Sequence, residues 1–174
     1  MEIINRSVPY ATPWFDVVAK EVQANEAPFY SLRMADYVST VATTAAGELV
    51  LVRQFRPAVE RVTLELPGGL VDAGEDAATA AARELFEETG FVPEHLDLLG
   101  VLAPDTGRLG NSMSCFFAHN VVRRQDATGE PGLTWELVPI PRVRTLVMTG
   151  QFDHALNLAA LLLAALKFPS SFSL

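Results

Sequence analysis

The sequence is short of the residues that several common kinds of site require. Only one of its 174 residues is a cysteine, Cys115, which excludes an intramolecular disulfide and any metal site built from several cysteines. Lysine occurs only twice and neither lysine follows a glycine, so a phosphate-binding loop of the Gly-Lys-Ser/Thr kind is excluded. The three histidines, His95, His119 and His154, lack the spacing of metal ligands, and we expect structural roles for them.

Long apolar runs are also missing. The longest, residues 155–166, contains Asn157 and is too short to span a bilayer. The first residues, Met-Glu-Ile-Ile-Asn-Arg, do not have the basic and apolar regions of a signal peptide. From these observations we expect a cytoplasmic protein that does not insert into a membrane.

The charge balance narrows the choice of partners. The formal net charge is −8, which disfavours nucleic acid and anionic membranes. Hydrophobic residues make up 49% of the chain and charged residues 20%, as in an ordinary globular protein of one domain. An anionic substrate would therefore need a local cationic site, either a metal ion or some of the eleven arginines.

One acidic helix is predicted in the middle of the chain, over residues 75–88. Alanines fill its centre, and Gly90 stands where a left-handed C-terminal cap belongs. On such a helix Glu84, Glu87 and Glu88 fall at positions i, i+3 and i+4, so their side chains lie on one side. The apolar arc expected to face the core consists of Ala78, Ala81, Ala82 and Leu85.

Two readings of the three glutamates are open. A charge cluster on a helix is often a solvated surface. Alternatively the cluster binds a hard divalent cation such as Mg²⁺, which takes oxygen ligands and would offset the repulsion between the carboxylates. The residues that flank the helix favour the second reading.

The flanking residues extend the pattern over residues 69–91. The spacing is Gly, five residues, Glu, seven residues, then Arg-Glu-Leu-x-Glu-Glu-x-Gly-apolar. This pattern resembles the Nudix box and matches it at Gly69, Glu75, Arg83, Glu84, Leu85, Glu87, Glu88, Gly90 and Phe91. The resemblance implies a hydrolase that depends on Mg²⁺, or on Mn²⁺, and acts on a nucleoside diphosphate linked to another moiety.

The rest of the chain reads as strands and one further helix. Strands are expected at residues 15–22, 28–34, 37–44, 48–55, 62–66, 96–103, 113–122 and 133–139. Residues 37–44 and 48–55 are expected to form a hairpin, and residues 104–111 and 123–132 are expected to form loops. A closing apolar helix is expected to start at an Asp153 cap and to be buried on more than one side.

These elements predict an α+β fold in one domain. The resemblance implies the Nudix α/β/α sandwich with a mixed sheet. Residues 1–45 would be N-terminal strands that extend from it and dimerise, and residues 46–174 would be the catalytic core.

Motifs outside the box point to a subfamily. Gln54-Phe55-Arg56, Glu65-Leu66-Pro67-Gly68-Gly69 and Gly150-Gln151-Phe152-Asp153 resemble segments of ADP-ribose pyrophosphatases and related nucleotide-sugar hydrolases. Two departures leave the substrate open between ADP-ribose, GDP-mannose and UDP-glucose. Gly68 stands where these enzymes often have alanine, and residues 104–108 lack the Ser-Pro-Gly segment that many of them carry.

The resemblance also implies roles for the acidic residues. Glu84, Glu88 and the Gly68 carbonyl would bind Mg²⁺, with Glu87 bound directly or through water. The metal would orient a water molecule for in-line attack on phosphorus, and either Glu130 or Glu87 would take its proton. Arg83 would act with these catalytic residues by orienting the glutamates.

Further residues are expected to contact a nucleotide substrate. Arg56 and Arg108 would hold phosphates, and Glu65 belongs to the motif beside them. In a homodimer, Phe29 or Arg33 of one subunit would lie beside the substrate site of the other. The rival from a different class is a non-catalytic module that senses a nucleotide, but such a module would be expected to have lost carboxylates that are all present here.

Overall fold

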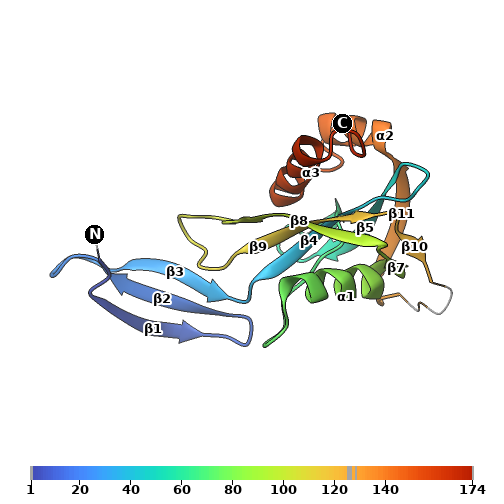
Figure 1. The fold of residues 1–174 in the computed structure, drawn as a ribbon. Helices are drawn as coiled ribbons and strands as arrows, with labels where there is room; N and C mark the ends of the chain where they lie inside the picture. Colours follow the sequence, from blue (N-terminus) through green and yellow to red (C-terminus); the bar gives the residue numbers. More distant parts are fainter. Residues whose placement is uncertain (1, 125–126, 128, 174) are drawn as a thin grey trace.

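Two three-stranded sheets, covered by helices on both faces, form the core of the molecule together with a two-stranded sheet of β7 (Phe91–Val92) and β10 (Val122–Arg123). A further three-stranded sheet extends away from the core (Figure 1). The computed structural model describes residues 2–124, 127 and 129–173. The extension consists of β1 (Asn5–Ala11), β2 (Phe15–Glu21) and β3 (Phe29–Met34). The core strands are β4 (Tyr37–Ala42), β5 (Glu48–Arg56), β6 (Arg61–Glu65), β7 (Phe91–Val92), β8 (His95–Leu102), β9 (Met113–His119), β10 (Val122–Arg123) and β11 (Leu133–Pro139). The helices are α1 (Ala77–Thr89), α2 (Ile140–Met148) and α3 (Ala155–Lys167).

The core confirms the predicted α+β class and the sandwich of a mixed sheet between helices. One sheet has the order β4-β9-β8, with β4 and β9 parallel and β9 and β8 antiparallel. The other sheet, of order β11-β5-β6, is antiparallel. Helix α1 covers one face of this layer, and α2 and α3 cover the other (Figure 1).

The predicted hairpin of residues 37–44 and 48–55 is wrong. β4 pairs with β9, far along the sequence, and β5 pairs with β6 and β11. A single bridge between Thr43 and Leu49 joins the two segments before they diverge into different sheets. The short turn between them made a hairpin plausible, but partners distant in sequence pair with both strands.

Strands β4 and β5 are buried on both faces where they cross the core, at residues 38–42 and 49–52. Residues 49–52 are a continuous apolar run without alternation, whereas the buried part of β4 also contains Ser39 and Thr40. In β5, Leu49 and Leu51 pack into the core under α2 and α3, while Val50 packs into the core under α1. In β4, Val41 packs into the core under α2 and α3, and Val38 packs against α1. The two cores therefore lie on opposite faces of the same strands.

Helix α1 begins two residues later than predicted, because Asp76 caps it. Its carboxylate accepts hydrogen bonds from the N–H groups of Ala78 and Thr79, at 3.0 Å each. The predicted C-terminal cap at Gly90 is observed, with φ of 75° and its N–H bonded to the carbonyl of Phe86. The apolar arc differs in one position from the prediction, since Ala78 is exposed and Ala80 is buried in its place.

Ala80 and Ala81 have no exposed surface and pack against Val38 of β4 and Phe116 of β9. Two alanines at the contact bring the helix close to the sheet, because a methyl group is all that separates their backbone from the strands. This contact sets how far the acidic side of α1 stands from β4.

The C-terminal part contains one helix that the sequence did not reveal and one that begins differently. Helix α2 was not predicted. Its N-cap is Pro139 and Pro141 lies in its first turn, where proline is well tolerated. The predicted Asp153 cap is wrong: Asp153 binds Arg61 at 2.6 Å, and the Nδ1 atom of His154 accepts the N–H of Asn157 instead.

Helix α3 was expected to be buried on more than one side, and this is wrong for the isolated chain. Leu162 is 57% exposed and Leu166 is 68% exposed.

Among the residues that the structure describes, no helix is both long and apolar enough to cross a membrane. Cys115 is buried, as expected, and burial raises the pKa of its thiol to about 11.

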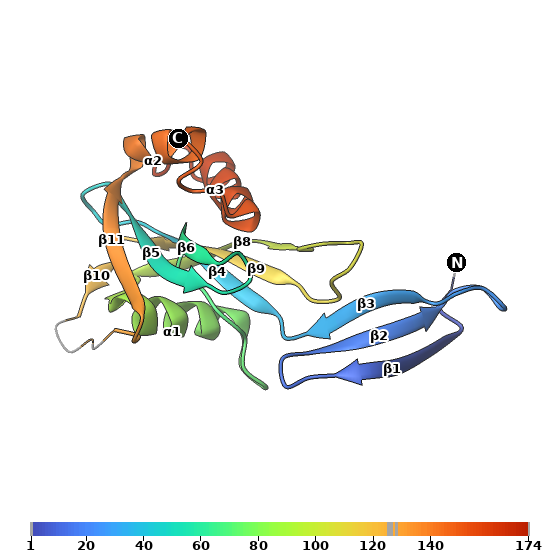
Figure 2. The same cartoon turned by 180° about the vertical axis from the view of Figure 1, so that it is seen from behind.

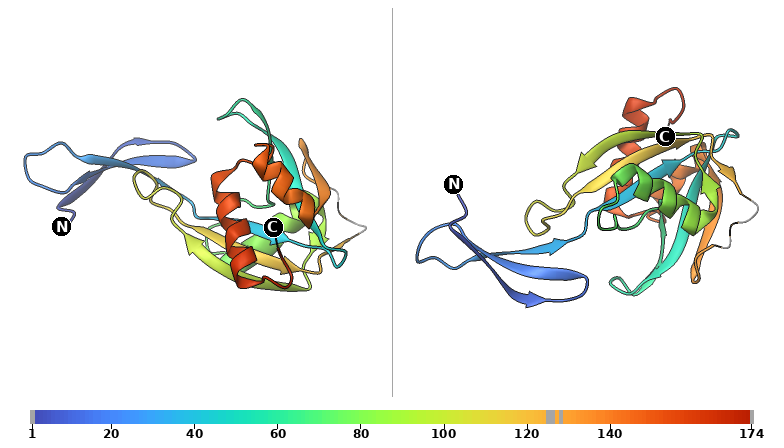
Figure 3. Two further views of the ribbon diagram at one scale, coloured as in Figure 1. Left: turned by 90° about the horizontal axis from the view of Figure 1, so that it is seen from above. Right: turned by 60° about the horizontal axis from the view of Figure 1, so that its bottom comes forward.

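The N-terminal sheet stands apart from the sandwich and contains a strand that was not predicted (Figures 2 and 3). β1 is exposed along its whole length and its register shifts between Ser7 and Tyr10, so the sequence carries no alternating signal there. β4 lies before the division predicted at residue 45, yet it belongs to the core. Residues 125, 126 and 128 of the predicted 123–132 loop lie outside the described part of the chain.

Candidate active site

Residues 66–69 cross from the β5–β6 sheet to the edge of β4, and this crossing forms one wall of the site. The carbonyl groups of Pro67 and Gly69 accept hydrogen bonds from backbone N–H groups of β4, each at 2.9 Å. Neighbouring groups of an extended chain face opposite ways, so the N–H and carbonyl of Gly68 face away from β4. The Gly68 N–H donates to Oε2 of Glu88 at 2.9 Å, which places the Gly68 carbonyl on the same side as that carboxylate.

Glu88 is a buried carboxylate with little to stabilise its charge. It is 4% exposed, and among the described residues its carboxylate accepts one hydrogen bond, from the Gly68 N–H. Burial, with the nearby charges of Glu84 and Glu130, raises the pKa of Glu88 to about 8. Burial also raises the pKa of Glu84. Two neighbouring carboxylates with raised pKa values favour a cation between or beside them.

Arg83 holds the acidic side of the helix in place. Its Nε and Nη2 atoms donate to the carboxylate of Glu75, both at 3.0 Å. Nη1 donates to Glu84 at 2.8 Å and to Glu87 at 3.1 Å, and Nη2 also donates to the carbonyl of Leu70. With all three nitrogens committed, Arg83 orients the glutamates in the way the sequence predicted for it. Its role in catalysis stays a prediction.

The two glycines of the crossing are required for different reasons. A Cβ atom on Gly69 would stand 2.4–2.5 Å from the carboxylate atoms of Glu84. A Cβ atom on Gly68 would stand 2.2 Å from the carbonyl oxygen of Val38 in β4. At both positions the backbone lies too close to its neighbour to leave room for a Cβ atom, which explains why Gly68 is not alanine in this chain.

Arg56, which is partly exposed, and Glu65, which is buried, form an ion pair next to the crossing. Nε and Nη2 of Arg56 donate to the two oxygens of Glu65 at 2.9 and 2.6 Å, and the Thr63 hydroxyl donates to Glu65 at 2.6 Å. Burial alone would raise the pKa of Glu65, but these hydrogen bonds outweigh it and the pKa is lowered. The Arg56 side chain remains 43% exposed, so its Nη1 atom can meet an anion.

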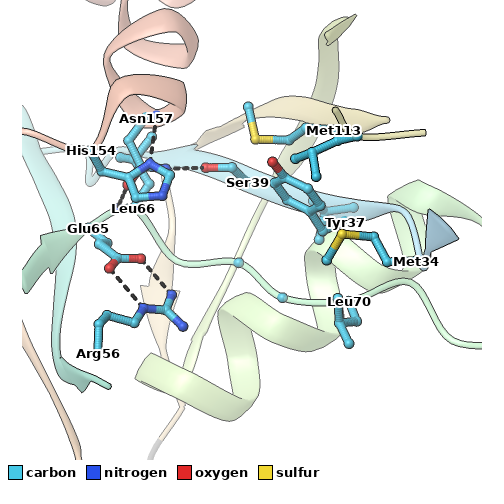
Figure 4. Close-up of a pocket in the computed structure, with 14 residues that line it drawn as sticks. Met34, Tyr37, Ser39, Arg56, Glu65, Leu66, Leu70, Met113, His154 and Asn157 are labelled. Carbon is cyan, nitrogen blue, oxygen red and sulfur yellow. Dashed lines mark hydrogen bonds and ion pairs between the residues drawn. The ribbon is translucent and has the colours of Figure 1, made fainter. Parts of the chain in front are cut away.

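A cleft of about 360 Å³ lies between the crossing and the Arg56–Glu65 pair (Figure 4). Arg56 and Glu65 lie at one end, and the glycines of the crossing form its floor. The other residues that line it are Met34, Tyr37, Val38, Ser39, Leu66, Leu70, Leu109, Met113, His154 and Asn157. Most of these were not predicted as site residues. A polar Asn157 inside an apolar helix was the one signal in the sequence that could have revealed part of this lining.

The two candidates for the general base lie on the outer side of the glutamate cluster. Glu87 is half exposed and holds Arg83. Glu130 is exposed and lines a hollow with Phe86 and Glu87, and its charge acts on both Glu84 and Glu88. The structure brings both residues to the cluster, as the sequence predicted, and both roles stay predictions.

Three residues predicted to contact substrate lie elsewhere in the single chain. The guanidinium of Arg108 lies over the ring of Phe29, 5.7 Å from its centre, in a separate hollow of about 480 Å³. Arg33 points to the N-terminal sheet, where it binds Asp16 at 2.7 Å. None of the three lines the cleft of Arg56 and Glu65. A role for them would require a second subunit.

The donor set suits a hard cation. Within the described ranges, no three Asp, Glu, His or Cys side chains form a ready-made metal cage. Mg²⁺ does not require one, because it usually takes one or two carboxylates and completes its shell with water and substrate phosphates. Glu84, Glu88 and the Gly68 carbonyl offer oxygen ligands only, and the raised pKa of buried Glu88 shows where a positive charge would be stabilising.

Comparison with known proteins decides the family. Residues 34–155 match the NUDIX domain. The chain belongs to the Nudix family. The nine box positions had predicted this. The matched range leaves out β1, β2, all of β3 except Met34 and all of α3 except Ala155.

The Nudix chain is also similar to individual proteins. It is 64% identical over 44 residues to an ADP-ribose pyrophosphatase of Saccharomyces cerevisiae, covering 25% of this chain and 19% of the relative. It is 32% identical over 84 residues to an ADP-ribose pyrophosphatase of Bacillus subtilis, covering 48% and 45%. It is 33% identical over 122 residues to ADP compounds hydrolase NudE of Escherichia coli, covering 66% and 62%. The alignments thus span less than two thirds of these relatives.

The fold extends the likeness to the whole Nudix chain. A solved structure described as an ADP compounds hydrolase superimposes with a TM-score of 0.82 at 25% identity. The superposition covers 97% of this chain and 94% of the other, so it includes the N-terminal sheet.

Proposed function

We propose that this Nudix protein hydrolyses the pyrophosphate bond of a nucleoside diphosphate linked to a second moiety, with ADP-ribose as the first candidate. The observation that carries the proposal is the pairing of Glu88 with the backbone of Gly68, a residue that lines the same cleft as Arg56. The names of the relatives, which are ADP-ribose pyrophosphatases and ADP compounds hydrolases, support the choice of an ADP-containing substrate.

Glu84, Glu88 and the Gly68 carbonyl would hold Mg²⁺. When bound, the ion supplies positive charge to the pyrophosphate and a polarised water molecule. Arg56, fixed by Glu65, would bind a phosphate with its remaining nitrogen. The water oxygen attacks phosphorus, the bond to the bridging oxygen breaks, and ADP-ribose would give AMP and ribose 5-phosphate.

We favour Glu130 over Glu87 as the base that takes the proton of this water. The charge of Glu130 acts on Arg56, Glu84 and Glu88, which surround the proposed site. Glu87 instead accepts a hydrogen bond from Arg83, which also binds Glu84, and this contact makes the Glu87 carboxylate less available to accept a proton from water.

Hydrolysis should require an added divalent cation. We expect turnover of ADP-ribose with Mg²⁺ and none in excess chelator, because the ligands are carboxylate and carbonyl oxygens that bind hard cations. The measurement is product formation by chromatography with ADP-ribose, GDP-mannose, UDP-glucose, diadenosine polyphosphates and nucleoside triphosphates. Full turnover in chelator would contradict the metal-dependent reaction, and the substrate with the highest kcat/KM would identify the linked moiety.

The same panel tests the non-catalytic alternative. A nucleotide-sensing module would bind one of these compounds, as measured by calorimetry, without releasing product at any metal concentration. The retained carboxylates favour the enzyme, since a sensor has no need of two buried acids whose pKa values are raised.

We also propose that the protein is a homodimer in which the N-terminal sheet contacts the partner. This sheet carries aromatic side chains that are largely exposed in the single chain, including Trp14 at 75%, Tyr10 at 62% and Tyr30 at 52%. Leu166 on α3 is 68% exposed. Monomeric soluble proteins seldom expose so much apolar surface in one element.

Light scattering at micromolar concentration should give about twice the chain mass of 18.9 kDa. We expect Trp14→Glu to shift the mass toward the monomer, because a charge at the centre of an apolar interface is costly. Met148→Glu, at an equally exposed residue on α2, is the control and should leave the mass unchanged. A wild-type mass near 18.9 kDa would disprove the dimer.

A further inference from the structure

Asn157 is the polar exception in the most apolar helix of the chain, and both ends of its amide are used. The residue is 4% exposed. Its Oδ1 atom accepts the backbone N–H of Leu66 at 2.9 Å, and its Nδ2 atom donates to the hydroxyl of Ser39 at 3.2 Å. Figure 4 shows the side chain between these two partners at the edge of the cleft. One side chain thus joins α3 to β4 and to the crossing of residues 66–69.

The Leu66 N–H lies where the chain changes sheets. The ladder between β5 and β6 ends at Glu65, and the contacts with β4 begin at Pro67. Leu66 falls between the two ladders, and a buried N–H without a partner is costly. The amide of Asn157 satisfies it from the side chain of a helix more than 90 residues further along the sequence.

We propose that Asn157 is a positioning residue for the metal site. It fixes the crossing so that the Gly68 carbonyl, two residues after Leu66, lies on the same side as the Glu88 carboxylate, where both could bind one metal ion. Glu65, one residue before Leu66, is fixed at the same time, and with it Arg56. The inference rests on the metal-dependent hydrolysis proposed above, and it assigns Asn157 no contact with substrate or metal.

The packing of α3 alone would be served as well by an apolar residue, although that residue would leave the Leu66 N–H without a partner. Leucine is a better helix former than asparagine and would suit the apolar core around α3. The bonds of Asn157 are instead directed at the segment that carries the metal-binding carbonyl. Residues of this kind, which orient ligands without touching the metal, typically change metal affinity or activity by 10–100-fold when replaced.

The test is Asn157→Leu, which removes both hydrogen bonds while keeping the side-chain volume similar. We expect Mn²⁺ alone to bind roughly tenfold or more weakly, as measured by the electron paramagnetic resonance signal of the free ion. We expect kcat to fall at saturating Mg²⁺ with a smaller change in KM for substrate. Hydrogen exchange should also accelerate at the Leu66 amide more than at the neighbouring amides of β6.

Two control variants separate positioning from general stability. Leu146→Ala removes a buried side chain of α2, away from the cleft, and should lower the melting temperature without changing Mn²⁺ affinity. Ser39→Ala removes only the partner of Nδ2 and should change the affinity less than Asn157→Leu does. If Leu146→Ala weakens Mn²⁺ binding as much as Asn157→Leu, the proposal is overturned.

The outcomes also separate this proposal from the proposed function. If the wild type hydrolyses the nucleotide and Asn157→Leu binds Mn²⁺ normally, only the positioning role is disproved. If the wild type does not hydrolyse the nucleotide, but binds Mn²⁺ and Asn157→Leu weakens that binding, the proposed function is disproved and the positioning role stands. If Asn157→Leu does not fold, Asn157→Ser replaces it, since its hydroxyl is too short to reach Leu66.

Discussion

Glu88→Gln should lower kcat by roughly 10²-fold while the protein stays folded. The substitution keeps an oxygen that can accept the Gly68 N–H, so the local geometry survives. It removes the negative charge that would hold the cation against the Gly68 carbonyl, and stabilisation of developing charge of this kind is worth two to three orders of magnitude in rate. Glu84→Gln should also lower kcat by more than tenfold.

The same substitution should raise stability in chelator at neutral to alkaline pH. The pKa of Glu88 is raised from 4.5 to about 8, with burial as the main cause. Below pH 4.5 the residue is protonated in both the folded and the unfolded chain. Between pH 4.5 and 8 only the unfolded chain releases the proton, so the free energy of unfolding falls as pH rises, by an amount on the order of 5 kcal/mol. Glutamine has no such dependence.

Thermal melts at pH 5 and pH 8 measure this difference. In chelator the wild type should lose stability between these pH values, and Glu88→Gln should lose much less. Added Mg²⁺ should restore the wild type and have little effect on the variant, because only the ionised carboxylate gains from the cation. Wild-type activity in Glu88→Gln would show that Glu88 does not bind a catalytic cation.

Gly69→Ala should reduce activity by more than tenfold with a small change in melting temperature. The added methyl group would occupy the place of the Glu84 carboxylate, which stands 2.4–2.5 Å from the ideal Cβ position. A flexible side chain can move away at little cost in stability, but it then leaves the proposed metal site. Gly68→Ala should behave differently and destabilise the fold, because its neighbour at 2.2 Å is the backbone carbonyl of Val38.

A double-mutant cycle makes this prediction specific. Gly69→Ala and Glu84→Gln affect the same carboxylate, so the double variant should be no less active than Glu84→Gln alone. Additive losses would show that Gly69→Ala acts through another route. Calorimetric titration with Mg²⁺ should show the same non-additivity in metal affinity.

The acidic helix could be predicted from the sequence because its determinants are local. The Gly90 cap, the central alanines and the spacing of Glu84, Glu87 and Glu88 all lie within a few turns of one helix. The helix starts at Ala77, two residues after the predicted start, because the Asp76 cap was not recognised. Arg83 could be placed with the glutamates for the same reason, since its partners lie within eight residues of it, apart from the Leu70 carbonyl.

The walls of the cleft could not be predicted, because they come from segments that meet only in the folded chain. The parallel pairing of β4 with β9 joins residues more than 70 positions apart, and no local pattern specifies it. Ser39 and Asn157 are 118 residues apart. His154 was expected to be structural, and it does cap α3, but it also lines the cleft.

The close packing of Ala80 and Ala81 makes the two residues a spacer between the acidic helix and β4. Both are fully buried against Val38 and Phe116, so a larger side chain at either position has nowhere to go except by lifting the helix. Glu88 would rise with it, away from a Gly68 that β4 holds in place. The distance between the two sides of the proposed metal site therefore depends on two methyl groups that carry no charge and touch no ligand.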